Sequence, residues 1–419
     1  MAQAAETLVH AHEDAILPDT GIARTEPAPI TLSVHHDFAA VEADWRRFEG
    51  TADCTPFQTF DWLFAWQRHV GAAKGITPAI VTARRGDQML LLLPLGIARR
   101  GFARCLTFLG DVLCDYNAPL LAPNFATLAP DGFLPLWDDI RRLLQEAPAT
   151  RHDLVTFDKM PARIGAQKNP MLALNVQLNP SGAYETELPA DWEQFYSSKR
   201  SSSTRRRDRT KLKRLGELGP VRFVNPDTSA ELALTFDLLV QQKSKAFARM
   251  GVPNLFAPTG HAAFYRELAT SPRYRSLVHL SRLDVGTTWA ALNLGITFRD
   301  CYFHILASYD DGETSRFGPG AAHLRELLRY AMGRGLTRFD FTIGDEPYKR
   351  DWCDTEQQLF DYSAATTVRG LPAAAMTFGW GRAKRAIKQT APVWNAVQRL
   401  RAAAGSLRKK PEAAAKDAD

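Results

Sequence analysis

The segment "SRFGPGAAHLRELLRYAMGRG", residues 315–335, decides the fold because a Gly-Pro-Gly turn runs directly into an amphipathic helix. Apolar side chains recur there at intervals of three and four residues, which predicts a helix with one buried face. They are Leu324, Leu327, Leu328 and Ala331. Pro319 suits the first helical position, because its missing N–H would have no partner there.

The start of this helix has no conventional cap. No Ser, Thr, Asp or Asn stands beside Gly318-Pro319-Gly320 to accept hydrogen bonds from the open backbone N–H groups. Gly320 has no Cβ, so a ligand can approach its backbone closely. The dipole at such a helix end attracts an anion by a few tenths to about 1 kcal/mol per charge. The missing cap therefore predicts a ligand phosphate; the alternative is a plain loop-to-helix junction.

Strands are predicted on both sides of the helix, at 301–310 and 337–343, after a hairpin at 275–298 that turns at Gly286. The same order of hairpin, strand, helix and strand occurs earlier, beginning with the hairpin at 77–97. We therefore predict an α/β (α+β) fold built twice, with mixed sheets and flanking helices. The alternative is two ordinary α+β domains that share an element order.

The predicted divisions follow from this repeat. They are a disordered tail at 1–29, an N-terminal half at 30–180, a C-terminal half at 181–370, and a basic helical extension and tail at 371–419. The 419 residues are 45% apolar and 23% charged, as in globular proteins. The longest apolar run, 89–98, is too short to cross a bilayer and contains a proline. No signal peptide is recognised near the start, so we expect a cytoplasmic protein.

The cysteines and histidines predict neither a disulfide framework nor a metal site. The five cysteines are odd in number and form no Cys-x-x-Cys pair. The ten histidines show no ligand spacing. We expect no metal.

Two basic segments predict anionic partners. Residues 199–214 hold nine basic residues and one acid, and residues 382–410 hold nine basic residues and no acid. The first should form a helix at the edge of a cleft, facing an anionic small molecule, the phosphates of a ligand, RNA or only solvent. Few aromatic residues accompany it, which disfavours base stacking. The second places Val393, Trp394, Val397 and Leu400 at helical spacing. It would lie on an anionic membrane surface or pack on the domain.

The segment at 309–352 resembles the C-terminal half of the GNAT-type acetyltransferases linked to bacterial cellulose and exopolysaccharide clusters, the CelD-like proteins. These are related to the FemAB-type aminoacyl transferases. "GDEPYKRDW" (344–352) is its most specific part, and the segments at 57–71 and 106–123 resemble the family's first half. The resemblance covers roughly 30–370 and implies a tandem GNAT-like fold, that is, two acyl-CoA N-acyltransferase folds in one chain.

The resemblance also implies a binding mode for acyl-CoA. The acyl-CoA would lie where two strands splay, with its pyrophosphate at the glycine-rich helix start. That loop would comprise Phe317, Gly318, Gly320 and Ala321. Ser315 stands where the family usually has Gln or Arg, so Arg316 would substitute. The first half has no Gly-x-Gly before its helix, so it would not bind CoA and would shape the acceptor site.

Acyl transfer to an amine needs a base, an oxyanion donor and an acid for the leaving thiolate. The resemblance makes Tyr348 the thiolate acid, although a packing tyrosine is the alternative. Asp345 and Glu346 are the base candidates; otherwise they form a solvated helix start. His304 would lie beside the cleft, unless it is a core histidine.

Asp340 and Lys349 are the predicted substrate-binding residues. Asp340 alternates with Phe339 and Phe341 on its strand, so it would point into the cleft. Lys349 would hold a phosphate or an acidic acceptor, or form a salt bridge with Asp345 or Asp351.

The predicted function is that of an acyl-CoA-dependent N-acyltransferase, an acetyltransferase acting on a saccharide or precursor in cellulose or exopolysaccharide biosynthesis. Its partners would be acetyl-CoA or another acyl-CoA, a small-molecule or saccharide acceptor, and an anionic membrane surface that holds it at the periphery of the inner membrane. One alternative is a FemAB-like transferase that uses aminoacyl-tRNA, which is less favoured because the long heptad hairpin of the peptidoglycan enzymes is missing. The other alternative is a non-catalytic accessory protein of polysaccharide synthesis.

Overall fold

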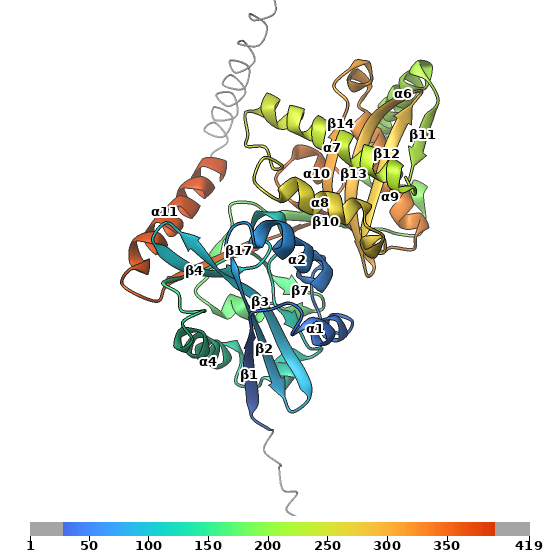
Figure 1. Ribbon diagram of the computed structural model, residues 1–419. Helices are drawn as coiled ribbons and strands as arrows, with labels where there is room; N and C mark the ends of the chain where they lie inside the picture. The colour runs from blue at the N-terminus through green and yellow to red at the C-terminus, as the bar shows by residue number, and fades with distance from the viewer. Residues whose placement is uncertain (1–27, 390–419) are drawn as a thin grey trace, which may run out of the picture.

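The computed structural model describes residues 28–389. Figure 1 shows two sheets, each with its own helices: the blue and green first half below, and the yellow and orange second half above it and to the right. Nearly all of the tail predicted at 1–29, and the segment with Val393, Trp394 and Val397, lie outside the described residues.

The first sheet has the strand order β1-β2-β3-β4-β6-β17-β9, and β5 pairs with β3. Its neighbours are antiparallel except β4 and β6, which are parallel. The strands are β1 (Ile30–His35), β2 (Thr77–Arg85), β3 (Gln88–Arg100), β4 (Ala103–Phe108), β5 (Leu120–Leu121), β6 (Leu154–Pro161), β9 (Gln177–Leu178) and β17 (Leu359–Ala365). A separate small hairpin joins β7 (Arg163–Ile164) to β8 (Gln167–Lys168).

The second sheet repeats this design with the order β11-β12-β13-β14-β15-β10-β16. Here β14 and β15 are the parallel pair. The strands are β10 (Ala183–Glu187), β11 (Val221–Val224), β12 (Val278–Val285), β13 (Thr288–Phe298), β14 (Cys301–Tyr309), β15 (Arg338–Ile343) and β16 (Thr355–Gln357). The hairpins that turn at Gly86 and Gly286 occupy matching places, so the predicted repeat of element order is confirmed.

The two halves exchange a strand. β10 follows the first half along the chain but pairs with β15 of the second sheet. β17 comes near the end of the chain but pairs with β6 and β9 of the first sheet, and in Figure 1 it is drawn with the first half. The sequence assigned 359–365 to the second half, because an apolar strand pattern does not reveal which sheet edge will receive the strand.

Helices cover both sheets. They are α1 (Glu42–Glu49), α2 (Phe60–Trp66), α3 (Phe125–Leu128), α4 (Phe133–Glu146), α5 (Trp192–Lys199), α6 (Ser202–Leu218), α7 (Ser229–Met250), α8 (His261–Thr270), α9 (Pro319–Gly333), α10 (Pro347–Arg350) and α11 (Gly370–Gln389). α7 begins at a Thr228 side-chain cap and ends at the left-handed Gly251, the usual signals for a helix start and stop. α9 buries the predicted apolar face.

A shared core holds the halves together. The Trp62 ring of α2 contacts the Phe264 ring of α8 edge to face, with centroids 5.0 Å apart. Phe57 of the first half meets Phe303 of β14 at 6.3 Å. One continuous cluster of buried apolar side chains runs through both regions. The position of one half against the other is therefore fixed by packing as well as by the exchanged strands.

Candidate active site

β14 and β15 are parallel neighbours that separate partway along their length. Three residue pairs are in register, namely Cys301 with Arg338, Tyr302 with Phe339, and Phe303 with Asp340. Beyond them, a β-bulge opposite Leu294 and Gly295 leaves Ile305 without a partner and bends β14. On the facing strand, Thr342 has a φ of +58°, an uncommon conformation for a β-branched residue that bends β15.

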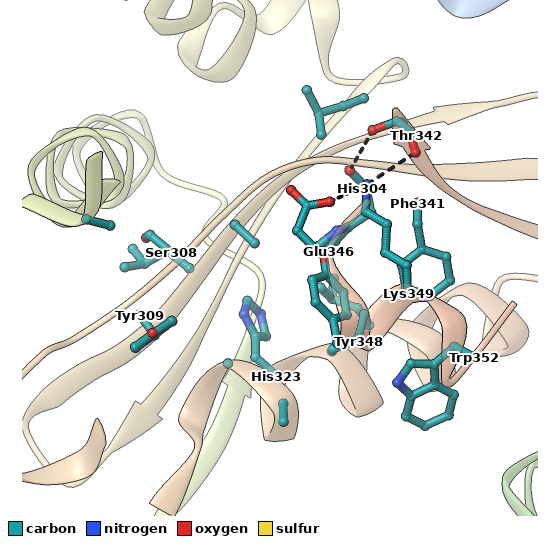
Figure 2. Close-up of a pocket in the computed structure, with 18 of the residues that line it drawn as sticks. His304, Ser308, Tyr309, His323, Phe341, Thr342, Glu346, Tyr348, Lys349 and Trp352 are labelled. Atoms are coloured by element: carbon teal, nitrogen blue, oxygen red, sulfur yellow. Dashed lines mark hydrogen bonds and ion pairs between the residues drawn. The ribbon is translucent and has the colours of Figure 1, made fainter. Parts of the chain in front are cut away.

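A cavity of about 530 Å³ occupies the space between the parted strands. Most of the residues that line it belong to α7, β14, α9, β15 and α10. Arg200 and Asp115, from other segments, also line it. Figure 2 shows the labelled side chains of β14, α9 and α10 gathered around this space. A cavity of this size at the opening of a sheet suits a small ligand or the narrow arm of a larger one.

The N-terminus of α9 reaches the cavity. Gly318 adopts the left-handed conformation (φ +66°), Pro319 occupies the first turn, and no side chain caps the helix. Gly320 and Ala321 line the cavity. A Cβ added to Gly320 would lie 3.3 Å from the Tyr309 ring, so glycine also allows the close contact between α9 and β14. The open amides and the helix dipole make this end favourable for an anion.

The other residues predicted to bind the pyrophosphate lie outside the cavity wall. Arg316 and Phe317 belong to the short helix η6 (Glu313–Phe317) that precedes Gly318. The Arg316 guanidinium pairs with Glu313 at 2.7 Å and stacks on the Phe317 ring. Gly318 provides the turn into α9. These residues therefore shape the approach to the cavity from its outer side.

The basic segment predicted at 199–214 forms a helix beside this loop. α6 packs against η6 and α9. The Lys211 Nζ lies 3.8 Å from the position that a Cβ on Gly318 would occupy. Arg200, just before α6, lines the cavity and donates to Asp351 at 2.6 Å. Lys211 therefore places a positive charge near the start of α9, whereas the Arg200 charge is paired with Asp351.

Glu346 and Tyr348 reach the cavity from the segment that forms α10. In Figure 2 they extend toward the same space as His323 of α9. The Tyr348 hydroxyl forms no hydrogen bond with a described residue, and its side chain is 39% exposed. Burial of part of the ring, with the neighbouring Glu346 charge, raises the pKa of Tyr348 well above its usual value, so the hydroxyl keeps its proton.

Lys349 fixes the end of β15. Its Nζ donates to the carbonyl oxygens of Thr342 (3.2 Å) and Ile343 (3.0 Å). It also pairs with Glu346 at 3.0 Å. The sequence predicted a salt bridge with Asp345 or Asp351 as one option, but the one-turn spacing of the helix selects Glu346 instead. Lys349 is 3% exposed, so its charge is committed to the protein.

His304 and His323 are buried histidines on opposite walls of the cavity. Burial, followed by the positive charges of Lys349 and Lys243, lowers the pKa of His304 to about 3. Burial also lowers the pKa of His323 to about 3, and its ring bonds Ser281 at 3.1 Å. Both rings are neutral at pH 7. His304 lines the cavity as predicted for a residue beside the cleft, although it is also packed like a core residue.

Asp340 and Asp345 do not line the cavity. Asp340 points to the opposite side of β15 and accepts a hydrogen bond from Tyr116 of the first half (2.7 Å). The prediction that it points into the cleft is wrong, because Phe339 and Phe341 occupy that face of the strand. Burial, with the nearby Glu185 charge, raises the pKa of Asp340 to about 7. Asp345 lies near Arg350 and Tyr184, and its negative charge raises the pKa of both.

Sequence reasoning missed Asp115 and Lys243. Asp115 belongs to the first half, in the stretch "LCDYNAP" (113–119), yet lines the cavity. Its pKa is raised by burial against the opposing effect of Lys159. Lys243 of α7 donates to the Ala307 carbonyl at 3.1 Å, and burial lowers its pKa. No spacing rule links Asp115 to residues more than 200 positions away. The one signal in the sequence was that polar residues, among them Asp115 and Tyr116, interrupt an otherwise apolar stretch.

The described residues contain no cluster of histidine, cysteine and carboxylate side chains arranged to hold a metal ion. The five cysteines are all free. Between residues 28 and 389, no helix combines the length and hydropathy needed to cross a bilayer.

The architecture is a tandem GNAT-like fold, as predicted. Residues 202–350 match the family model described as an acetyltransferase (GNAT) domain, so the second half carries a GNAT-type domain. No curated protein sequence matches the chain. The narrower resemblance to cellulose-linked, CelD-like proteins stays a prediction.

Solved structures with this arrangement differ widely from the chain in sequence. FemX has a TM-score of 0.53 at 9% identity, over 78% of this chain and 96% of its own. A protein of unknown function from Bacteroides thetaiotaomicron has a TM-score of 0.49 at 12% identity, over 80% of this chain and 100% of its own. A tandem GNAT protein of the clavulanic acid pathway has a TM-score of 0.42 at 12% identity, over 81% and 99%. At these identities the similarity concerns the fold alone.

Proposed function

We propose that this protein transfers an acyl group, with acetyl as the simplest case, from a CoA thioester to an acceptor amine in the cavity between β14 and β15. The observation that carries the proposal is the parting of these two strands beside an uncapped helix start. A CoA pyrophosphate would meet the amides of Gly320 and Ala321, and the pantetheine arm would run into the cavity. Arg316 and Lys211 would add positive charge from the outer side.

The cavity offers groups for the chemistry of a thioester. The register pairs between β14 and β15 end at Phe303, and beyond it the His304 carbonyl accepts from the Thr342 hydroxyl. An amide of β14 that faces away from β13 there would stabilise a tetrahedral oxyanion. Tyr348 would protonate the leaving thiolate, supported by its raised pKa and by its unpaired hydroxyl. Glu346 forms an ion pair with Lys349 and would assist by fixing the start of α10. His304 would contribute a neutral wall beside the acyl group.

We further propose that only the second half, 181–370, binds the donor. In the first half, Phe108, Trp137 and Phe157 pack together beside the parallel strands β4 and β6. The rings of Phe108 and Phe157 lie 4.9 Å apart, and those of Trp137 and Phe157 lie 5.5 Å apart. In this proposal, these side chains would occupy the place in the first half that corresponds to the cavity of the second.

The proposal is tested by thermal unfolding with and without acetyl-CoA. Acetyl-CoA should raise the melting temperature in proportion to the logarithm of its concentration once the site is saturated. Free CoA should act similarly, since the phosphates provide much of the binding. No shift with either compound would exclude the donor site and favour a non-catalytic accessory protein.

A transferase that uses aminoacyl-tRNA is the second candidate, and the surface of α6 favours it. Six basic side chains are exposed on this helix, a density typical of phosphate-backbone binding. They are Arg206, Arg207, Arg209, Lys211, Lys213 and Arg214. Salt-dependent binding of tRNA, with no response to acetyl-CoA, would select this candidate. The acceptor in either case, and the proposed link to cellulose or exopolysaccharide synthesis, rest on the sequence resemblance.

A further inference from the structure

Asp115 brings the first half into the candidate active site. Among the described residues that line the cavity, it alone comes from the chain before residue 181. The neighbours of Asp115 are anchored on three sides. The Lys159 Nζ donates to the Cys114 carbonyl (2.6 Å), and the Gln58 Nε2 donates to the Tyr116 carbonyl (2.7 Å).

The third anchor crosses between the halves. The Tyr116 hydroxyl donates to Asp340 at 2.7 Å, and Asp340 also accepts from the Thr342 amide at 2.7 Å. These bonds connect the Asp115 loop to the bend in β15 that opens the cavity. A side chain between such fixed neighbours has little freedom, which is the arrangement expected of a group that must meet a substrate in one geometry.

Asp115 differs from the other cavity carboxylates in its partners. Glu346 is paired with Lys349, and Asp351 is paired with Arg200. No cation among the described residues lies within ion-pair distance of Asp115. The charges of Lys159, Lys349 and Glu346 act on Asp115 without a direct ion pair, and the Thr342 side chain interacts with it by a hydrogen bond. A carboxylate that lines a cavity without a paired cation can receive an external one.

Resting on the proposed acyl transfer, we infer that Asp115 binds the ammonium group of the acceptor and accepts its proton during the reaction. The bound ammonium group first releases one proton to solvent water. The lone pair of the resulting amine then forms the new N–C bond to the thioester carbonyl carbon, as Asp115 takes a second proton from nitrogen. The C–S bond then breaks, and the thiolate takes a proton from Tyr348, which is later restored from Asp115 through water. The products are the amide, free CoA and the proton released to water, and no further reactant is needed.

The experiment follows thiol release from acetyl-CoA in the presence of excess ethanolamine, glucosamine or Nα-acetyl-lysine as simple amine probes. Asp115→Asn keeps the size of the side chain and removes the base. We expect it to lower the amine-dependent rate by a factor of about 10² or more, the usual contribution of a general base. Acetyl-CoA should still raise the melting temperature of this variant as it does for the wild type. Asp115→Glu should restore part of the rate and shift its pH profile.

Asp111→Asn is the matched control, because Asp111 lies in the same connection but pairs with Lys74 outside the cavity. Its rate should equal that of the wild type. An unchanged rate in Asp115→Asn would overturn the inference. So would a wild-type protein that binds acetyl-CoA but releases thiol no faster with any of the amines. Failure of acetyl-CoA to bind the wild type would instead overturn the proposed function.

Discussion

The Tyr116 hydroxyl of the first half donates a hydrogen bond to the Asp340 carboxylate on β15, with 2.7 Å between the oxygens. Both groups are buried, so the bond forms away from water. It joins the loop that presents Asp115 to the strand that bends open at Thr342. A contact outside the cavity thus connects the two sides of the candidate active site.

Tyr116→Phe removes this bond and leaves the Asp340 carboxylate with one donor fewer in a buried place. We expect a loss of about 1 to 3 kcal/mol in the free energy of unfolding, measured by urea denaturation. Tyr330→Phe is the control, since the Tyr330 hydroxyl forms no hydrogen bond with a described residue. Equal effects of the two substitutions would show that the Tyr116–Asp340 bond adds no stability.

The pKa of Asp340 predicts a pH dependence of stability. Burial raises this pKa to about 7 in the folded state, whereas the unfolded value is about 3.9. The folded state therefore binds a proton more tightly, and its stability falls as the pH rises between these two values. The Asp340→Asn side chain cannot ionise. The stability of this variant relative to the wild type should therefore increase as the pH rises between the two pKa values, and the difference should stay constant at higher pH. A difference that does not vary with pH would contradict the raised pKa.

Gly320→Lys should abolish the rise in melting temperature caused by acetyl-CoA. A side chain here must pass the Tyr309 ring, which lies 3.3 Å from the new Cβ, and would fill the proposed phosphate position. Gly333→Lys is the control on the same helix, because a Cβ at Gly333 meets no atom within 4 Å. Normal acetyl-CoA binding by Gly320→Lys would place the donor elsewhere.

Tyr348→Phe should slow acyl transfer with little change in donor binding. The hydroxyl is the proposed acid for the thiolate, and loss of a general acid lowers the rate by a factor of about 10² to 10⁴. Thiol release gives kcat, and the melting shift with acetyl-CoA reports binding. A loss of binding with kcat intact would make Tyr348 a packing residue, the alternative that its sequence left open.

A chain shortened to end after residue 358 should lose the stability of the first half. It lacks β17, the neighbour of β6, so the first sheet would expose an apolar edge. We expect the urea midpoint to fall sharply for the whole molecule, since both halves share a core. A chain ending at residue 389 keeps β17 and should unfold like the full chain. Independent, unshifted unfolding of the second half would show that the strand exchange does not couple the halves.

The sequence by itself determined the elements and their repetition. Local periodicity and turn residues predict three features. These are the strands β14 and β15 on either side of α9, the hairpins at Gly86 and Gly286, and the buried face of α9. The uncapped Gly-Pro-Gly start was visible because capping depends on neighbours in the chain. Glu346 and Tyr348 could be assigned to the cavity region because they follow a predicted strand end.

Only the tertiary structure decided which strand joins which sheet and which side chains meet. β17 belongs to the first sheet, Asp340 faces Tyr116 instead of the cavity, and Asp115 enters the cavity from the other half. Each of these depends on contacts between residues about 200 positions apart. Local patterns specify how a segment is built, whereas the edge that a strand pairs with is set by the packing of the complete chain.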